Sequence, residues 1–189
     1  MAVDPDEPRV AIPRLDPQIP VFALGRYAGV RRQAIIAVKE RGRSDLIGPL
    51  ASVLSAAIHR LLCWHMVDLP LTIVPAPTRA AAARRRGGDP VARIAQAATA
   101  GRTDITVAPI LRMRAWTRDS VGLGGDARQR NIAGRVLVRR WGRSDISGVQ
   151  GDVLIVDDVV TTGATLAESV RVLRGVGIPV SAALVIASV

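Results

Sequence analysis

The chain has 189 residues, of which 49% are hydrophobic, and a single cysteine, Cys63. That length fits one domain with a substantial core, and one cysteine excludes an internal disulfide and a zinc site built from several cysteines. The net charge is +10, and Lys39 is the one lysine among 26 basic residues. This charge would attract polyanions such as nucleic acid or polyphosphate, although a solvated arginine-rich surface explains it as well. Only 3% of the residues are aromatic, so few side chains are available for base stacking.

The first 20 residues combine prolines with charges and predict a flexible N-terminal tail. They lack the basic and then apolar start of a signal peptide. No apolar run reaches the roughly 20 residues that a bilayer span needs. We therefore expect a cytoplasmic protein without membrane contact, and we expect Cys63 to be buried, as free cysteines usually are.

Apolar periodicity predicts alternating strands and helices along the rest of the chain. A strand is expected at Val21–Tyr27, followed by a helix within 28–43 and a second helix within 44–65 that has Ser44 as its N-cap. The middle of the chain predicts a strand at Leu71–Pro77, a helix near 91–99 and a strand within 104–113. A polar loop rich in glycine, a short helix or turn near 126–131 and a strand at 135–140 are expected next. The last unit is a strand, a helix and a strand at 153–157, 165–174 and 178–187. Apolar strands that alternate with helices indicate a parallel sheet covered on both faces. We predict one α/β domain over residues 21–189, with a strand and helices at 21–66 and the core at 71–189.

The stretch VLIVDDVVTTGATLAE, from Val153 to Glu168, places two acids and a Thr-Thr-Gly turn between a strand and a helix. Ligands of parallel sheets bind beyond the carboxyl ends of the strands, so Asp157 and Asp158 are expected at that edge. Side chains alternate across a strand, so the two acids would bracket a ligand rather than both face the core. The turn offers unpaired N–H groups, a glycine and hydroxyls to a phosphate. A sugar phosphate fits both parts of the motif.

Three other interpretations of this motif are less complete. Receiver domains also end a strand in Asp-Asp, but near the chain start and without a Thr-Thr-Gly turn. A Walker-B strand would need a GK[ST] loop, which the sequence lacks. Plain capping of the following helix would not need two acids.

The stretch VLIVDDVVTTGAT resembles the phosphoribosyl-diphosphate (PRPP) binding sequence of type I phosphoribosyltransferases. This resemblance implies a Rossmann-like parallel sheet with helices on both faces and a small N-terminal hood. It implies that Asp157 and Asp158 are the catalytic acids and hold the ribose 2′- and 3′-hydroxyls. It also implies that Mg²⁺ is held by the ligand and meets the acids through water, without a direct protein ligand. The 5′-phosphate would bind to Thr161, Thr162, Gly163, Ala164 and Thr165.

Three further stretches resemble the competence-protein ComF family, so that the resemblance covers most of residues 27–187. They are YAGVRRQAIIAVKERG, IVPAPTRAAAARRRGGDPVARIA and RMRAWTRDSVGLGGDARQRNIAGRV. The family has the pattern R-x-R-G-F-N-Q. This sequence keeps both arginines and the glycine of that pattern at 84–87, whereas residues 88–90 replace its Phe, Asn and Gln. Ser120 stands where glutamine is usual, and a cysteine-pair zinc module is absent. These differences concern the acceptor side and leave the PRPP motif intact.

The diphosphate and the acceptor are assigned to other segments. Thr78 and Arg79 follow the strand at Leu71–Pro77, and Arg84 and Arg86 would neutralise the diphosphate, because guanidinium groups bind phosphate in a bidentate way. A solvated run of arginines is the alternative. The loop at 117–125 would form a lid or an ordinary surface loop. The lid and acceptor residues are expected among Lys39, Arg112, Arg114, Thr117, Arg128 and Asn131, and the alternative for Lys39 is a solvated helix position.

Two functions follow from these resemblances. The first is a PRPP-dependent phosphoribosyltransferase that passes phosphoribosyl to an unidentified nitrogen acceptor, a nucleobase or an amine, and releases diphosphate. The sequence shows no general base for the acceptor. The second is a ComF-like factor that senses PRPP without turnover and takes part in the uptake or processing of single-stranded DNA, by binding the DNA or a DNA-processing protein. A structural relic of the fold is the third alternative, which the complete phosphate turn argues against.

Overall fold

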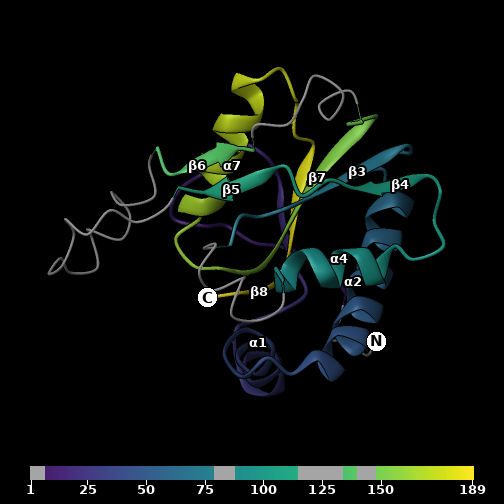
Figure 1. The fold of residues 1–189 in the computed structure, drawn as a ribbon, viewed down its shortest axis with the longest axis vertical. Helices are drawn as coiled ribbons and strands as arrows, with labels where there is room; N and C mark the ends of the chain where they lie inside the picture. Colours follow the sequence, from purple (N-terminus) through teal and green to yellow (C-terminus); the bar gives the residue numbers. More distant parts are fainter. Residues whose placement is uncertain (1–6, 79–87, 115–133, 140–147) are drawn as a thin grey trace, which may run out of the picture.

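The computed structural model describes residues 7–78, 88–114, 134–139 and 148–189 and shows a six-stranded sheet with helices on both faces (Figure 1). The sheet has the strand order β1-β2-β8-β7-β3-β4, and a separate two-stranded hairpin pairs β5 with β6. Neighbouring strands of the sheet are parallel except β1 and β2, which are antiparallel. The strands are β1 (Arg9–Val10), β2 (Val21–Ala23), β3 (Leu71–Pro75), β4 (Ile105–Val107), β5 (Leu111–Met113), β6 (Val136–Val138), β7 (Asp152–Val160) and β8 (Ala182–Ser188). The predicted α/β fold is thereby confirmed.

Two hydrophobic clusters lie on opposite faces of this sheet. Helices α1 (Gly29–Arg41), α2 (Ile47–Cys63) and α4 (Pro90–Ala98) pack on one face, and helix α7 (Ala164–Gly175) and the β5–β6 hairpin pack on the other. Figure 1 shows these two layers on either side of the strands. Because both faces are covered, the central strands are apolar along nearly their whole length, as the sequence pattern indicated.

The order of the strands creates a topological switch point between β3 and β7. From β3 the chain passes through α4 to β4 at one edge of the sheet, whereas from β7 it passes through α7 to β8 in the opposite direction. The two crossover helices therefore leave the sheet on opposite faces. Such a junction opens a crevice at the carboxyl ends of the two strands, where ligands of α/β sheets bind.

The single strand expected within 104–113 is wrong, because the chain turns there. Ile105–Val107 belongs to the main sheet, and Leu111–Met113 forms the hairpin with β6. The N–H of Ile110 donates to the carbonyl of Ala108 at 2.8 Å, which closes a three-residue turn around Pro109. Proline lacks the N–H that a central strand would need at this position.

The expected flexible tail is wrong from residue 9 onward. Arg9–Val10 pairs with β2, and the N–H of Ala11 donates to the carbonyl of Val21 at 2.8 Å. The segment then runs across the end of the sheet, where the N–H of Leu15 donates to the carbonyl of Thr162 at 2.9 Å. Backbone pairing at the sheet edge thus orders a stretch whose composition suggested a tail.

The region 21–66 is divided between the sheet and one of its faces. Its strand β2 pairs with β8, and α2 packs against α4. Helix α1 packs against β8 near the carboxyl ends of the strands, so it borders the rim where the hood was expected.

The start and the end of α2 differ from the expectations. Ser44 opens a 3₁₀ turn, η1 (Ser44–Leu46), and Leu46 is the N-cap without a side-chain bond, so the Ser44 cap is wrong. Cys63 is exposed rather than buried, and its Sγ lies 3.6 Å from His59 Nε2. Cys63 therefore does not have the core-packing role that was expected for it.

Within the described residues, one helical stretch of 20 residues, Ser44–Cys63, is long and apolar enough to cross a membrane by length and composition alone, and its mean hydropathy is 1.6 in an 18-residue window. The expectation that no stretch reaches this length is therefore corrected. The stripe formed by Leu50, Leu54, Ile58 and Leu61 is buried in the core below α2. Packing of this stripe against the sheet explains the high hydropathy of the helix.

Candidate functional site

The two acids lie at the end of β7 and point to different faces of the sheet. Ile155 packs in the cluster beneath α7, and Val156 packs in the cluster beneath α1 and α2. The alternation along the strand therefore directs Asp157 toward the α7 side and Asp158 toward the α1 side. Both acids fall inside the strand, which continues to Val160, rather than just beyond it. Asp157 lies three residues and Asp158 two residues before the end of the strand, and the bracketing of a ligand by these acids stays a prediction.

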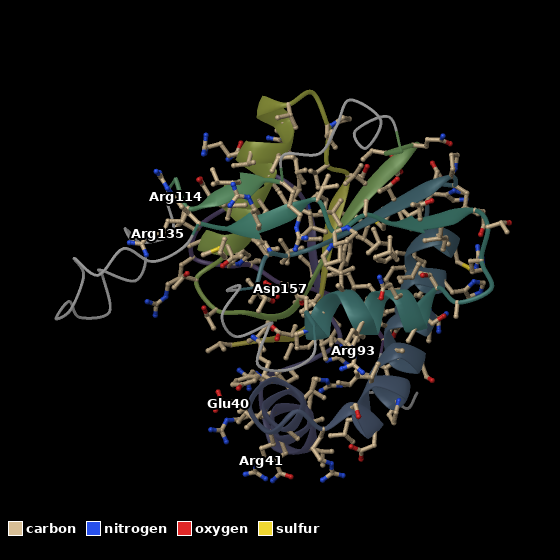
Figure 2. All side chains as sticks on the ribbon, viewed as in Figure 1. Glu40, Arg41, Arg93, Arg114, Arg135 and Asp157 are labelled. Carbon is tan, nitrogen blue, oxygen red and sulfur yellow. The ribbon has the colours of Figure 1, made fainter. Side chains whose placement is uncertain are left out.

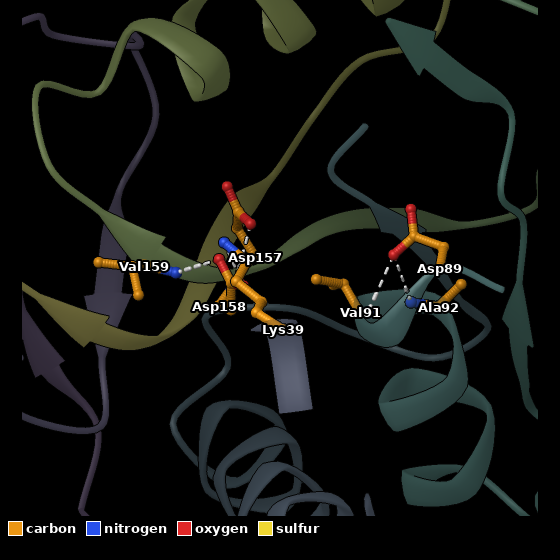
Figure 3. A network of polar contacts seen from close by, with 7 residues as sticks. All are labelled: Lys39, Asp89, Val91, Ala92, Asp157, Asp158 and Val159. Carbon is orange, nitrogen blue, oxygen red and sulfur yellow. Dashed lines mark hydrogen bonds and ion pairs between the residues drawn. The ribbon is translucent and has the colours of Figure 1, made fainter. Parts of the chain in front are cut away.

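Lys39 of α1 forms an ion pair with Asp158 at the end of β7 (Figure 3). Its Nζ lies 2.5 Å from Asp158 Oδ2, and the side chains of Lys39 and Asp158 are 37% and 6% exposed. Asp158 Oδ1 accepts a hydrogen bond of 2.7 Å from the N–H of Val159, so Lys39 is the partner of the second oxygen within the described chain. The solvated position that was an alternative for Lys39 is thus excluded.

The pKa of Asp157 is shifted by burial and by its neighbour Asp158. Burial raises the pKa of Asp157 well above its ordinary value, the charge of Asp158 raises it further, and Lys39 opposes both effects. Burial lowers the pKa of Lys39, but attraction to Asp158 outweighs it, so that the pKa of Lys39 is raised. Asp157 therefore keeps its proton to a higher pH than an exposed aspartate does, while Lys39 stays charged.

The turn after β7 has the geometry of an anion-binding helix start. Gly163 is the N-cap of α7 and has φ +84°, a left-handed conformation that favours glycine. In the described part of the chain, the N–H groups of Thr161, Thr162 and Gly163 find no acceptor. A weak bond of 3.4 Å joins the N–H of Ala164 to Thr162 Oγ1. Free N–H groups at a helix N-terminus attract a phosphate through hydrogen bonds and the helix dipole.

Strand β3 and the start of α4 form the other side of the switch point. Pro75 of β3 is in register with Val156, and Thr78 follows just beyond this rim. Asp89 is the N-cap of α4, and its Oδ1 accepts from the N–H of Val91 at 2.9 Å (Figure 3). Asp89 and Pro90 replace the last two residues of the R-x-R-G-F-N-Q pattern. This replacement has a local reason, because an aspartate N-cap followed by proline at N1 starts a helix well.

Several predicted site residues lie outside the described residues. These are Arg79, Arg84 and Arg86 of the diphosphate segment, and Thr117, Arg128 and Asn131 of the lid segment, together with the loop at 117–125. Their assignments stay predictions.

Arg112 lies on β5 and Arg114 directly follows it, and β5 pairs with β6, which packs against α7. Figure 2 shows Arg114 beside Arg135, and both lie apart from Asp157. Among the described residues, no polar contact joins Arg112 or Arg114 to the acid pair or to the phosphate turn. The structure therefore does not bring these two arginines into the site.

Glu168 is a residue of this region that the sequence interpretation missed. Its side chain is 8% exposed, accepts a bond of 2.6 Å from the N–H of Gly134 and pairs with Arg171 at 2.7 Å. It thereby joins α7, whose N-terminus forms the phosphate turn, to the base of the β5–β6 hairpin. The sequence could have indicated this residue, because Glu168 is a charged residue at a position of the helix where the apolar periodicity expects a buried side chain.

The oxygen donors at the rim suit Mg²⁺ held mainly by its ligand. Asp157 and Asp158 offer hard oxygen atoms, which Mg²⁺ contacts directly or through water. No group of three or more histidines, cysteines or acids close enough to hold a metal ion occurs within the part of the chain that the structure describes. These two oxygen donors fit Mg²⁺ that is held mainly by its ligand, and the contact through water stays a prediction.

Two surface hollows lie away from this rim and contain none of the predicted site residues. One runs between α2 and the end of α4, past Ser52, His59 and Thr99, and the other lies along the outer side of α1, near Arg32 and Arg41. The candidate site is therefore defined by its polar groups and its topology rather than by the depth of a hollow.

Comparison with known proteins finds similarity to a phosphoribosyltransferase over part of the chain. No family model matches the chain. A segment of 58 residues, 28% of this chain, is 45% identical to orotate phosphoribosyltransferase from Aeropyrum pernix and covers 31% of that protein. The chain therefore spans about a third of the length of this curated relative. The mixed, mostly parallel sheet and this shared segment together relate the chain to the type I phosphoribosyltransferase superfamily.

Proposed function

We propose that the protein is a PRPP-dependent phosphoribosyltransferase that passes phosphoribosyl to a nitrogen acceptor. The observation that carries this proposal is the continuity of the acid pair and the phosphate turn. Asp157 and Asp158 lie near the carboxyl end of β7 at the switch point, and Gly163, five residues after Asp158, opens α7 in a left-handed conformation. A ribose 5-phosphate unit carries both a diol and a phosphate, so one ligand offers a partner to each of these groups.

In the proposed reaction, each part of the site acts on one part of PRPP. The free N–H groups of the turn bind the 5′-phosphate, and the acids accept hydrogen bonds from the ribose hydroxyls. Mg²⁺, when bound, would supply charge neutralisation at the diphosphate, and Asp157 and Asp158 would contact it through water. Arg79, Arg84 and Arg86 would bind the leaving diphosphate. The chain thus contributes orientation and charge stabilisation to an oxocarbenium-like transition state at C1′.

The acid pair is tested by calorimetry with PRPP and Mg²⁺. Wild type should bind, and the variant carrying Asp157→Asn and Asp158→Asn should lose most of its affinity. Asp104→Asn is the matched control, because Asp104 pairs with Arg102 on the surface at the β4 edge of the sheet. Equal binding by wild type and the double variant, both folded by circular dichroism, would exclude the assigned site.

The acceptor is tested separately by diphosphate release. The relative from Aeropyrum pernix is named an orotate phosphoribosyltransferase, so orotate is the first acceptor to try, followed by other nucleobases and amines. Release of diphosphate that depends on one acceptor would identify the substrate. Tight PRPP binding without release in the presence of any acceptor would favour a sensor over an enzyme.

The second candidate is a ComF-like cytoplasmic factor for single-stranded DNA, with or without PRPP as its signal. Its specific support is the arginine-bearing outer side of α1, where Arg32, Arg41 and Arg43 line a shared hollow. A gel shift with single-stranded DNA at low and high salt tests it, since phosphate contacts weaken steeply with salt. The absence of a shift at low salt would exclude direct DNA binding and leave recruitment by a DNA-processing protein as the remaining route.

A further inference from the structure

We infer that Lys39 neutralises one of the two charges of the acid pair, so that the end of β7 accepts the hydroxyls of an anionic sugar instead of a bare divalent cation. This inference rests on the proposed function and deepens it, because it names the chemical class of ligand for which the acid pair is built. The ligand class is a sugar phosphate that keeps its diol free.

The position of Lys39 follows from the periodicity of α1. Ile35 and Val38 are the buried residues of this helix, and Lys39 follows Ile35 by one turn. The side chain of Lys39 therefore leaves the helix on the side that faces the sheet. The neighbouring Glu40 and Arg41 are exposed and lie on the outer side of α1 (Figure 2).

The ion pair is built into the protein rather than formed by chance on its surface. Asp158 is almost completely buried, and a buried carboxylate without a counter-ion is strongly disfavoured. Lys39 supplies that counter-ion from an element far away in the sequence. Within the described residues, Lys39 is the cation that contacts the acid pair.

The net charge of the cluster decides which ligand it prefers. Two adjacent ionised carboxylates would repel a sugar that carries phosphate groups, and they would attract a divalent cation directly. With Lys39 in place, at most one net negative charge remains, and the carboxylate oxygens can still accept hydrogen bonds from hydroxyls. The Lys39 ammonium also opposes the close approach of a second cation.

Lysine and arginine differ in how they would pair with Asp158. Position 39 holds the one lysine among 26 basic residues, all others being arginine. An ammonium is a compact charge on a flexible stem, whereas a guanidinium is a wide planar fork. Arginine is therefore expected to preserve the charge but to fit less well.

The experiment measures two ligands on the same set of variants. Ribose 5-phosphate is titrated without metal into wild type, Lys39→Met, Lys39→Arg and the control Glu40→Gln, which removes an exposed charge from the same helix. We expect Lys39→Met to bind about tenfold or more weakly, Lys39→Arg to recover part of the affinity, and Glu40→Gln to bind like wild type. Mn²⁺ alone is then followed by electron paramagnetic resonance, and we expect Lys39→Met to gain a bound ion that wild type and Lys39→Arg lack.

The outcomes separate this inference from the proposed function. If wild type binds ribose 5-phosphate and Lys39→Met binds it equally well, the inference is overturned while the proposed function stands. If Lys39→Met shows no gain in Mn²⁺ binding, the claim about cations is overturned. If wild type binds neither ribose 5-phosphate nor PRPP with Mg²⁺, both proposals are overturned. Should Lys39→Met fail to fold, Lys39→Gln takes its place, because it removes the charge and keeps a hydrogen-bond donor.

Discussion

Leu15 and Thr162 are joined by a backbone hydrogen bond of 2.9 Å, which fixes the N-terminal segment against the phosphate turn. The turn therefore has little room beside it. A Cβ atom at Gly163 would lie 2.5 Å from the carbonyl oxygen of Leu15, closer than such atoms approach, and φ at Gly163 is +84°. Both the contact and the backbone angle require glycine at this position.

Gly163→Ala is expected to lower the free energy of unfolding by about 1–3 kcal/mol and to weaken the binding of PRPP or ribose 5-phosphate. The loss arises because the turn must open away from the Leu15 carbonyl. Chemical denaturation and calorimetry measure the two effects. Gly175→Ala is the control, because nothing lies within 4 Å of a Cβ there, and it should leave both quantities unchanged or slightly improve stability.

Asp157→Asn is expected to change how stability depends on pH. The pKa of Asp157 is raised above its ordinary value of 3.8 by burial, so the native state holds the proton more tightly than the unfolded state does. The contribution of Asp157 to stability is present below pH 3.8 and is lost as the pH rises through the raised pKa. Relative to wild type, Asp157→Asn should therefore become more stable as the pH rises through this window, as measured by denaturation at a series of pH values.

The matched comparison for this pH effect is Asp104→Asn. Its pairing with Arg102 holds the pKa of Asp104 below its ordinary value, so its contribution is present above pH 3.8 and is lost as the pH falls through the lowered pKa. Asp104→Asn should thus become less stable relative to wild type as the pH rises. The same sign for both variants would contradict the assigned environment of Asp157.

Lys39→Met is expected to lower the free energy of unfolding by about 1–3 kcal/mol, since it leaves the buried Asp158 carboxylate without its counter-ion. Lys39 is itself partly exposed, which keeps the loss below that of a fully buried pair. Adding Asp158→Asn should restore part of the loss, because the unpaired charge is then removed. A double-mutant cycle by urea denaturation measures the coupling, and strictly additive effects would contradict the ion pair.

Glu168→Gln is expected to cost about 1–2 kcal/mol of stability, because a charged acceptor of the Gly134 N–H and the Arg171 pair is lost. The pKa of Glu168 is lowered, mainly by its bond to Arg171. The contribution should therefore be present above the ordinary pKa and disappear as the pH falls through the lowered value. Glu40→Gln, at an exposed position of α1, is the control for removing a charge and should have little effect.

The sequence by itself determined the local units of this protein. The apolar run before Asp157, the two acids and the Thr-Thr-Gly turn lie within one short stretch, and their order predicted a strand, a ligand-binding rim and a helix. The alternating apolar segments likewise predicted a covered α/β sheet. These features depend on neighbours along the chain, so composition and periodicity are sufficient to predict them.

Only the tertiary structure decided which distant groups meet at the site. It paired Lys39 of α1 with Asp158 and joined Glu168 of α7 to Gly134. It also ordered the segment around Leu15. At Pro109 the chain turns out of the main sheet, so that β5 pairs with β6 instead. Such contacts depend on how helices and edge segments pack across the sheet, and the charge or hydropathy of a residue does not say which element will lie beside it.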